Sequence, residues 1–260
     1  MRPWIPQLLC VASILSAGCD LAKKAEGKSE EKESDSKSAR TEGSKRSEGP
    51  IAPRAAKCKP VAWSGLQLVG EAKLEGEALS LLRQQSQVSG AWLPGRVDTS
   101  ELELSAVLLQ GAKLEQFADG VAITFVDGDA PTEPGGGGPA LGVPQKPIVA
   151  AGIHFPMEQP FFYAELWKGQ EGVPFMDEPP AREKLKRAPG ERLVELSVKG
   201  GLVTLAVHEG PDPSSPAATV SAKLGLSGSR SLGLTGSSGV YMAELGWKEL
   251  RVAVGDRCLP

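Results

Sequence analysis

Short apolar runs separated by glycine and proline follow one another along most of the chain. Residues 102–109 begin with alternating apolar and polar positions, the two-residue period of a strand with one buried face. Residues 121–126 are a β-branched apolar run between Gly120 and Asp127-Gly128, which are turn residues. Similar patterns predict further strands, at residues 148–155, 161–167, 193–198, 202–207, 218–224 and 247–254.

Turn residues support a fold made of strands. Lys199-Gly200-Gly201 stands between two predicted strands and predicts a tight hairpin. Helical periodicity is weak and occurs only around residues 77–85 and 181–186. The 31 Gly and 21 Pro also disfavour long helices, because helix interiors tolerate neither residue well. The sequence therefore predicts an all-β antiparallel sandwich of the jelly-roll type.

The N-terminus has the pattern of an export signal. Arg2 precedes the apolar run 8–15, which is too short to span a bilayer as a stable anchor. The run ends in Ser16-Ala17-Gly18-Cys19, which resembles a bacterial lipobox although Ser16 stands where Leu is preferred. The resemblance implies a lipoprotein signal peptide over residues 1–18, with Cys19 acylated and the protein anchored in the bacterial cell envelope. An ordinary signal peptide cleaved nearby is the alternative.

Residues 19–57 are predicted to be a charged, low-complexity tether. Residues 20–57 contain 10 positive and 8 negative side chains, one Leu, one Ile and no aromatic residue. Such a segment buries too little apolar surface to offset the entropy lost on ordering. The remaining domain, residues 58–260, has 18 positive and 24 negative side chains, a net charge of -6. This balance disfavours a nucleic-acid partner.

Cysteine positions predict a disulfide. Cys10 lies in the signal and Cys19 is the lipidation candidate, so Cys58 and Cys258 remain, near the two ends of the domain. Exported proteins favour disulfides, and pairing these two would place the ends of the domain side by side. Two unpaired thiols are the alternative.

Several motifs, in their order along the chain, resemble the L-type (legume-type) lectins. Residues 117–125 (FADGVAITF) are similar to that family's Ala-Asp-Gly strand. The other similar segments are residues 89–92 and 97–102 (early strands), 135–142 (a Gly-rich loop), 149–155 (the metal-bearing strand), 232–239 (a small-residue turn) and 244–247 (the start of a Trp strand). The resemblance implies a concanavalin A-like sandwich with neighbouring terminal strands.

The resemblance also implies carbohydrate binding. In the family, the Asp of Ala-Asp-Gly follows a cis peptide and accepts hydrogen bonds from sugar hydroxyls, a role for which Asp119 is the match. A carboxylate suits this role because it only accepts hydrogen bonds and can take two hydroxyls. Gly136, Gly137 and Gly138 match the loop whose backbone N–H groups approach the sugar. The alternatives are a plain turn at Asp119-Gly120 and a flexible connector at the glycines.

The family's metal site is not matched. Its calcium and transition-metal ligands include a Glu-x-Asp strand, and His154 and Pro156 stand at those two positions. Proline has no side-chain donor, and one His does not make a site for a hard cation. We therefore expect no metal and no cofactor. Without the metal that orients the Asp and its loop, the argument for sugar binding is weaker.

Three further groups of residues are candidates for binding or catalysis. Phe161, Phe162, Tyr163 and Trp167 form an aromatic cluster that either stacks on sugar rings or fills the core. Glu101 and Glu103 share one strand face, but without the closely spaced carboxylate pattern of sandwich glycosidases, so that face is expected to be solvated. A Ser-His-Asp triad would have only His154 or His208 available, and no Gly-x-Ser-x-Gly elbow occurs.

The sequence therefore predicts a non-enzymatic, membrane-anchored lectin-like module that binds glycan. The first alternative is a degenerate lectin sandwich without a sugar site, used for protein contacts or as a structural component of the envelope. The Pro-rich segment Val173–Pro189 is expected to be a long loop and is a candidate for a partner contact. The second is a glycan hydrolase with an unrecognised carboxylate pair.

Overall fold

The structure is a computed structural model that describes residues 51–111, 119–144, 148–156, 159–169, 179–213, 215–239 and 244–260. No helix in these ranges is long and apolar enough to cross a membrane. Strands and short 3-10 turns make up the regular structure: η1 (Ala55–Lys57), η2 (Trp63–Gly65), β1 (Gln67–Gly70), β2 (Lys73–Glu75), β3 (Ala78–Leu82), β4 (Val88–Trp92), β5 (Val97–Asp98), β6 (Glu101–Gln110), β7 (Gly120–Val126), η4 (Gly138–Ala140), β8 (Ile148–His154), β9 (Phe161–Lys168), β10 (Ala181–Lys186), β11 (Gly190–Lys199), β12 (Leu202–Val207), β13 (Ala218–Lys223), β14 (Ser229–Ser237), β15 (Leu245–Val254) and β16 (Arg257–Cys258).

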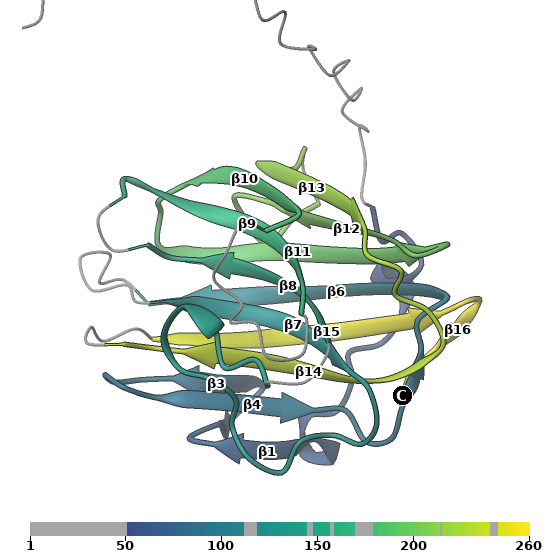
Figure 1. Ribbon diagram of the computed structural model, residues 1–260, viewed down its shortest axis with the longest axis horizontal. Helices are drawn as coiled ribbons and strands as arrows, with labels where there is room; N and C mark the ends of the chain where they lie inside the picture. Colours follow the sequence, from purple (N-terminus) through teal and green to yellow (C-terminus); the bar gives the residue numbers. More distant parts are fainter. Residues whose placement is uncertain are drawn as a thin grey trace, which may run out of the picture. The chain divides into compact units, whose positions relative to one another are not determined.

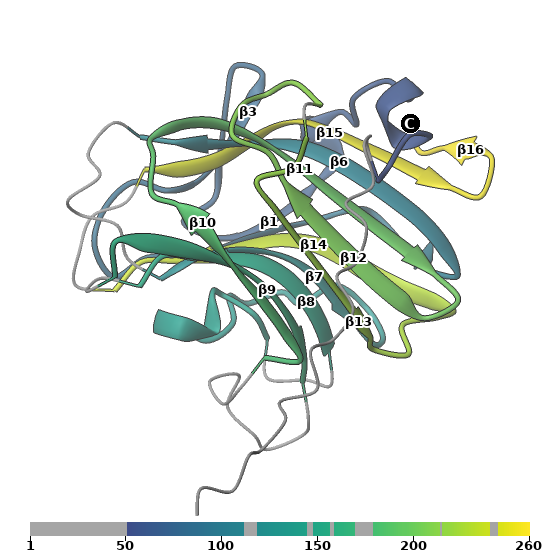
Figure 2. The ribbon, with the colours of Figure 1, turned by 90° about the horizontal axis from the view of Figure 1, so that it is seen from above.

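Two antiparallel sheets pack face to face (Figures 1 and 2). The front sheet has the strand order β1-β4-β14-β7-β8-β9-β10, and β5 pairs with β14. The back sheet has the order β13-β12-β11-β6-β15-β3-β2, and β16 pairs with β15. The predicted all-β sandwich is confirmed.

The core fills the space between the sheets. Alternate residues of β6 (Leu102, Leu104, Ala106 and Leu108) are buried in one cluster with alternate residues of β7 (Val121, Ile123 and Phe125). Because successive side chains of a strand point to opposite faces, this alternation assigns the other residues of each strand to the outer faces. The outer face of the front sheet is the one on which the candidate site lies.

A bulge keeps β15 in register with this core. Trp247 and Leu250 both point into the core although they are three residues apart, which simple alternation forbids. The pairing of β15 with β6 shifts between Lys248 and Arg251, and Glu249 there has a φ of 55°. The extra residue restores the inward phase for the second half of the strand.

The runs predicted as strands coincide with strands of the structure: β6, β7, β8, β9, β11, β12, β13 and β15. The hairpin is also confirmed, because Gly200 and Gly201 have φ of 58° and 77° between the paired strands β11 and β12.

Three sequence interpretations are corrected. The weakly helical stretches at 77–85 and 181–186 contain β3 and β10, each hydrogen-bonded to a neighbouring strand. The segment Leu232–Gly239, for which the resemblance predicts a small-residue turn, contains most of β14, in the interior of the front sheet. Its glycines serve packing: a Cβ on Gly233 would lie 2.5 Å from the Trp92 ring. In the Pro-rich segment Val173–Pro189, residues 173–178 lie outside the described residues, and residues 181–186 form β10.

Residues 51–57, which composition assigns to the tether, pack on the domain that was predicted to begin at residue 58. The N-terminal arm, residues 51–58, lies on the outer face of the back sheet. The backbone N–H of Ile51 donates to Glu195 Oε2 at 3.1 Å, and Arg54 donates to Glu103 through its backbone N at 2.7 Å and its Nε at 2.6 Å. These polar contacts, together with the burial of Ala52, Ala55 and Cys58 against Ala253, hold the arm on the sheet.

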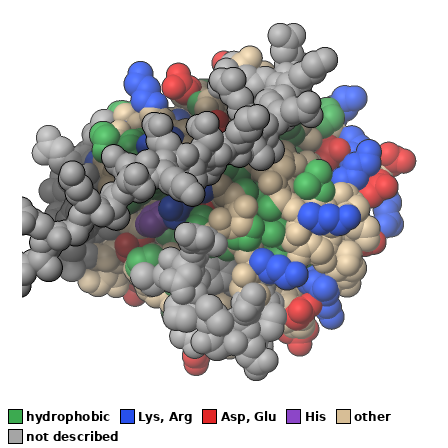
Figure 3. Space-filling model, turned by 45° about the horizontal axis from the view of Figure 1, so that its top comes forward, with side chains coloured by type: hydrophobic (Ala, Val, Ile, Leu, Met, Phe, Trp, Pro, Cys, Tyr) green, Lys and Arg blue, Asp and Glu red, His purple; other side chains and the backbone are tan. Residues whose placement is uncertain are grey.

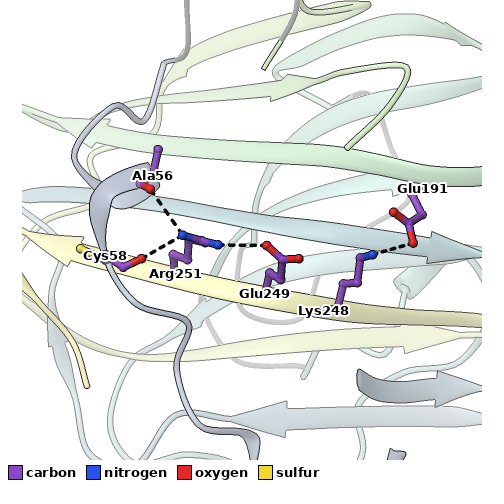
Figure 4. Close-up of polar contacts among 6 residues, drawn as sticks. All are labelled: Ala56, Cys58, Glu191, Lys248, Glu249 and Arg251. Carbon is purple, nitrogen blue, oxygen red and sulfur yellow. Dashed lines mark hydrogen bonds and ion pairs between the residues drawn. The ribbon is translucent and has the colours of Figure 1, made fainter. Parts of the chain in front are cut away.

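The disulfide between Cys58 and Cys258 is present, with Cα atoms 5.5 Å apart, as predicted. Figure 4 shows Arg251 of β15 beside it, donating to the carbonyl oxygens of Cys58 at 3.1 Å and Ala56 at 3.4 Å. The same guanidinium pairs with Glu249 at 3.0 Å. The arm is thus joined to the back sheet both covalently and by hydrogen bonds.

Candidate functional site

Asp119 lies at the start of β7 in a backbone conformation that most residues avoid. Its φ is 53°, in the left-handed region, where Asp is tolerated better than most non-glycine residues. Its carbonyl accepts a hydrogen bond from the Phe155 N–H at 2.7 Å. Gly120, the next residue, pairs with His154 of β8 on one side and Ser237 of β14 on the other. The sheet therefore fixes the position of Asp119. Ala118 lies outside the described residues, as does the peptide bond for which the resemblance implies a cis form.

The carboxylate of Asp119 has an unused hydrogen-bond acceptor. Its Oδ2 is buried and has no hydrogen-bond partner among the described residues. Gly239 borders it, since a Cβ placed there would lie 3.1 Å from Oδ2. Burial raises the pKa of the Asp119 carboxyl above its ordinary value, and the electrostatic effect of His154 opposes that shift. A buried acceptor without a donor is costly, so the site is suited to a ligand that brings hydroxyl donors.

The glycine-rich loop reaches the same end of the front sheet. Ser237, which pairs with Gly120, donates its hydroxyl to the Gly138 carbonyl at 2.5 Å. Gly138 has a φ of 63° and opens η4, and a Cβ there would meet no atom within 4 Å. Gly136 and Gly137 are more closely packed, against Ala140 and Val88. The structure therefore brings Asp119 and Gly138 together through Ser237, and only Gly138 borders open space.

Apolar burial anchors this loop on the front sheet. Leu141 and Val143, which follow the glycines, are buried in a second cluster on the outer face of the sheet. Their partners there include Trp92, Ala122 and Trp167, from three different strands. Packing on the sheet thus positions the loop beside Asp119.

The residues at the family's metal positions do not form a metal site. His154 Nδ1 lies 3.6 Å from Glu165 Oε2, and Glu165 Oε1 is 2.5 Å from Arg182 Nε. Pro156 offers no side-chain donor. In the ranges that the structure describes, no group of three or more His, Cys, Asp or Glu is placed to hold a metal ion. The described residues therefore do not fit a calcium site of the lectin type.

The aromatic cluster is divided between the two faces of β9. Phe162 is buried in the core between the sheets, whereas Trp167 is buried on the outer face, in the second cluster that contains Leu141 and Val143. Phe161 and Tyr163 are half-buried on the outer face, 5.1 Å apart in an edge-to-face arrangement. Arg182 and Lys184, which sequence reasoning did not select, lie over their rings. Positive residues stand at the alternate positions 182, 184 and 186, and this two-residue period could have revealed both the strand and the residues.

Glu101, Glu103 and His208, the candidates for catalysis other than His154, lie on the back sheet. Glu103 is buried and binds Arg54, so the expectation of a solvated face is wrong for Glu103, while Glu101 is exposed. His208 is fully buried with its Nε2 3.1 Å from Glu195 Oε2. These contacts hold the N-terminal arm and the sheet.

A groove on another part of the domain lies apart from Asp119. It has a volume of about 660 Å³ and is lined mainly by residues of β3, β6 and β15, together with Glu75 of β2 and Arg83, which follows β3. Neither Asp119 nor the glycine loop lines it.

No protein-family model matches the chain, and no curated protein matches its sequence. Solved structures do match. The exoplasmic/lumenal domain of VIP36 in its Ca2+- and mannose-bound form superposes with a TM-score of 0.60 at 12% identity, covering 73% of this chain and 82% of that one. This chain has the fold of the L-type lectins. Lectin I-B4 from Griffonia simplicifolia, in a metal-free form, superposes on the lectin-like domain with a TM-score of 0.58 at 13% identity, covering 73% of this chain and 93% of that one. The legume lectin-like domain from Entamoeba histolytica gives 0.58 at 12% identity, covering 74% and 91%.

Proposed function

We propose that the lectin-like domain binds carbohydrate without catalysing a reaction, with Asp119 accepting hydrogen bonds from sugar hydroxyls. The observation that carries this proposal is the buried Asp119 Oδ2 without a donor, beside Gly239 and joined through Ser237 to the glycine loop. The mannose bound to VIP36, a protein of the same fold, supports the ligand class. Gly138 in its open position gives the second side of the site, where a ligand can approach the backbone.

Contacts within the protein position both parts of the proposed site. The pairing of Gly120 with two strands fixes Asp119, and the burial of Leu141 and Val143 fixes the loop. In the L-type lectins that the sequence resembles, a metal ion orients the corresponding Asp and loop. Carbohydrate binding by this domain is accordingly independent of divalent metal.

We expect Asp119→Asn to lower glycan affinity by about tenfold or more, since hydrogen bonds to a charged group contribute about 1.5–3 kcal/mol. The measurement is binding on a glycan array followed by calorimetry on the best ligand, with and without EDTA. EDTA should leave binding by the native protein unchanged. Asp129→Asn is the matched control, because Asp129 is exposed on the segment that leads to the glycine loop.

The same variant should be more stable than the native protein at neutral pH. A carboxyl whose folded pKa is raised costs stability as pH rises from its ordinary pKa through the folded pKa, and the cost stays at higher pH. Asn removes that cost, so binding falls while stability rises. Loss of binding together with loss of stability would indicate a structural role for Asp119. No glycan binding by the native protein would favour the degenerate sandwich that contacts proteins.

We also propose that the domain is exported and held in the bacterial cell envelope by acylation of Cys19. The lipobox-like Ser16-Ala17-Gly18-Cys19 and the charged segment after it support this location. The disulfide supports export, because such bonds persist in oxidising compartments. Mass spectrometry of the mature N-terminus should find a diacylglyceryl group on the sulfur of Cys19, with or without an acyl chain on its amino group, and an unmodified Cys19 would contradict the proposal.

A further inference from the structure

Positive side chains line the outer face of β10, the edge strand of the front sheet. Arg182, Lys184 and Lys186 occupy alternate positions, while Leu185 between them points into the core. Alternate residues of a strand lie about 7 Å apart on one face. Figure 3, turned so that the side with β10 and β13 comes forward, shows Lys and Arg side chains with hydrophobic ones among them.

Aromatic rings hold two of these cations in place. The Arg182 guanidinium carbon lies 4.6 Å from the centre of the Tyr163 ring, and Lys184 Nζ lies 4.2 Å from the centre of the Phe161 ring. Both rings are on the outer face of β9, directly beside β10. Cation–π contacts of this kind fix the direction of a flexible side chain and leave its N–H donors available.

The charge of this surface is not fully balanced. Glu165, fully buried, pairs with Arg182. Lys184 and Lys186 take part in no ion pair within the described part of the chain. Glu183 faces the other way and accepts the Thr219 N–H at 2.6 Å. A positive surface therefore remains in a domain whose net charge is -6.

Strand register connects the positive surface to the Asp119 site. Gly120 of β7 pairs with His154 of β8, His154 pairs with Tyr163 of β9, and Tyr163 pairs with Lys184 of β10. These four residues form one row across the outer face. With strands about 4.8 Å apart, the row spans about 14 Å from the residue after Asp119 to Lys184.

We propose that the ligand of this domain is an acidic glycan that follows this row, with a neutral sugar hydroxyl at Asp119 and a carboxylate or sulfate group at Lys184 and Lys186. The inference rests on the proposed function at Asp119. The two ends of the row differ in charge, since a carboxylate at one end repels anions and ammonium groups at the other attract them. An anionic membrane surface is less suited, because lipid headgroups packed in a plane do not reach a buried acceptor.

The test compares the native protein with Lys184→Gln/Lys186→Gln. The control is Lys199→Gln/Lys223→Gln, which removes the same charge from two exposed positions on the back sheet. The probes are matched oligosaccharides, each neutral sugar being paired with its uronic acid and its sulfated form, together with phosphatidylglycerol vesicles. Binding is measured by calorimetry at low and high salt.

The native protein should bind an acidic probe about five- to tenfold more tightly than its neutral partner, and salt should reduce this preference. The β10 variant should lose the preference and keep its affinity for the neutral sugar, whereas the control pair should keep both. The uronic acid and sulfate probes identify which anion is preferred.

Three results would overturn the inference. These are equal affinity for acidic and neutral probes, an equal effect of the two lysine pairs, and lysine-dependent binding to vesicles without binding to acidic oligosaccharides. Asp119→Asn separates this failure from failure of the proposed function: if it weakens binding to neutral sugars, the Asp119 site stands and only the extension to β10 fails.

Discussion

Replacing Cys58 and Cys258 together by Ser should lower the free energy of unfolding by about 2–5 kcal/mol. The disulfide joins residues separated by 200 positions, so it removes many conformations from the unfolded chain. It also holds Cys58 in a small buried cluster with Ala52, Ala55 and Ala253. Urea denaturation of the oxidised native protein and of the double variant measures the difference.

The contribution of the arm's hydrogen bonds can be separated from that of the disulfide. Arg251→Met keeps the disulfide and removes the two hydrogen bonds from Arg251 to the arm, shown in Figure 4. Its cost should be about 1 kcal/mol, well below that of the double serine variant. Treating the native protein with reductant should reproduce the double variant. A double variant as stable as the native protein would contradict the assigned role of the disulfide.

Gly120→Ala should lower the free energy of unfolding by about 2–5 kcal/mol and should also reduce the proposed glycan binding. The φ of Gly120 is 147°, which L-residues rarely adopt, and a Cβ there would lie 2.1 Å from the Ile153 carbonyl oxygen. Relieving that clash separates β7 from β8 at the residue that follows Asp119. Thermal unfolding and glycan affinity of the purified variant measure the two effects.

The control for this variant is Gly128→Ala. Gly128 also has a positive φ, 82°, but a Cβ there would meet nothing within 4 Å. Gly128→Ala should lower the free energy of unfolding by only about 1–2 kcal/mol, from conformational strain, and should leave glycan binding unchanged. Equal effects of the two substitutions would mean that the close approach of β7 and β8 at Gly120 contributes nothing to the site.

The strands that sequence could predict are those whose local pattern and tertiary environment agree. β6 and β7 combine alternation or β-branched residues with burial, and their positions followed directly. β10 did not follow, because Glu, Lys and Leu are good helix formers, and it is pairing with β9 that makes this segment a strand. β14 was missed because its glycines resemble a turn, whereas they allow Trp92 to pack on the strand.

The candidate site was accessible to the sequence only where a motif is continuous in the chain. Asp119 and the glycine loop each belong to such a motif. The adjacency of His154, Tyr163 and Lys184 depends on the register of three strands. The sequence of a single strand does not determine that register. The arm was likewise assigned to the tether because its contacts with Glu195 and Glu103 are specific polar contacts that composition does not reveal.

The attachment of the N-terminal arm, residues 51–58, also has a consequence for how a pulling force would act on the domain. The chain enters at Ile51 on the outer face of the back sheet, whereas the proposed ligand row lies on the outer face of the front sheet. A pull between the proposed lipid anchor at Cys19 and a glycan in the proposed site would therefore act across the thickness of the sandwich. We expect such a pull to load the hydrogen bonds of Ile51 and Arg54 first, and we expect the disulfide at Cys58 to prevent further peeling. From there the disulfide passes the force to β16 and its neighbour β15, in the interior of the back sheet.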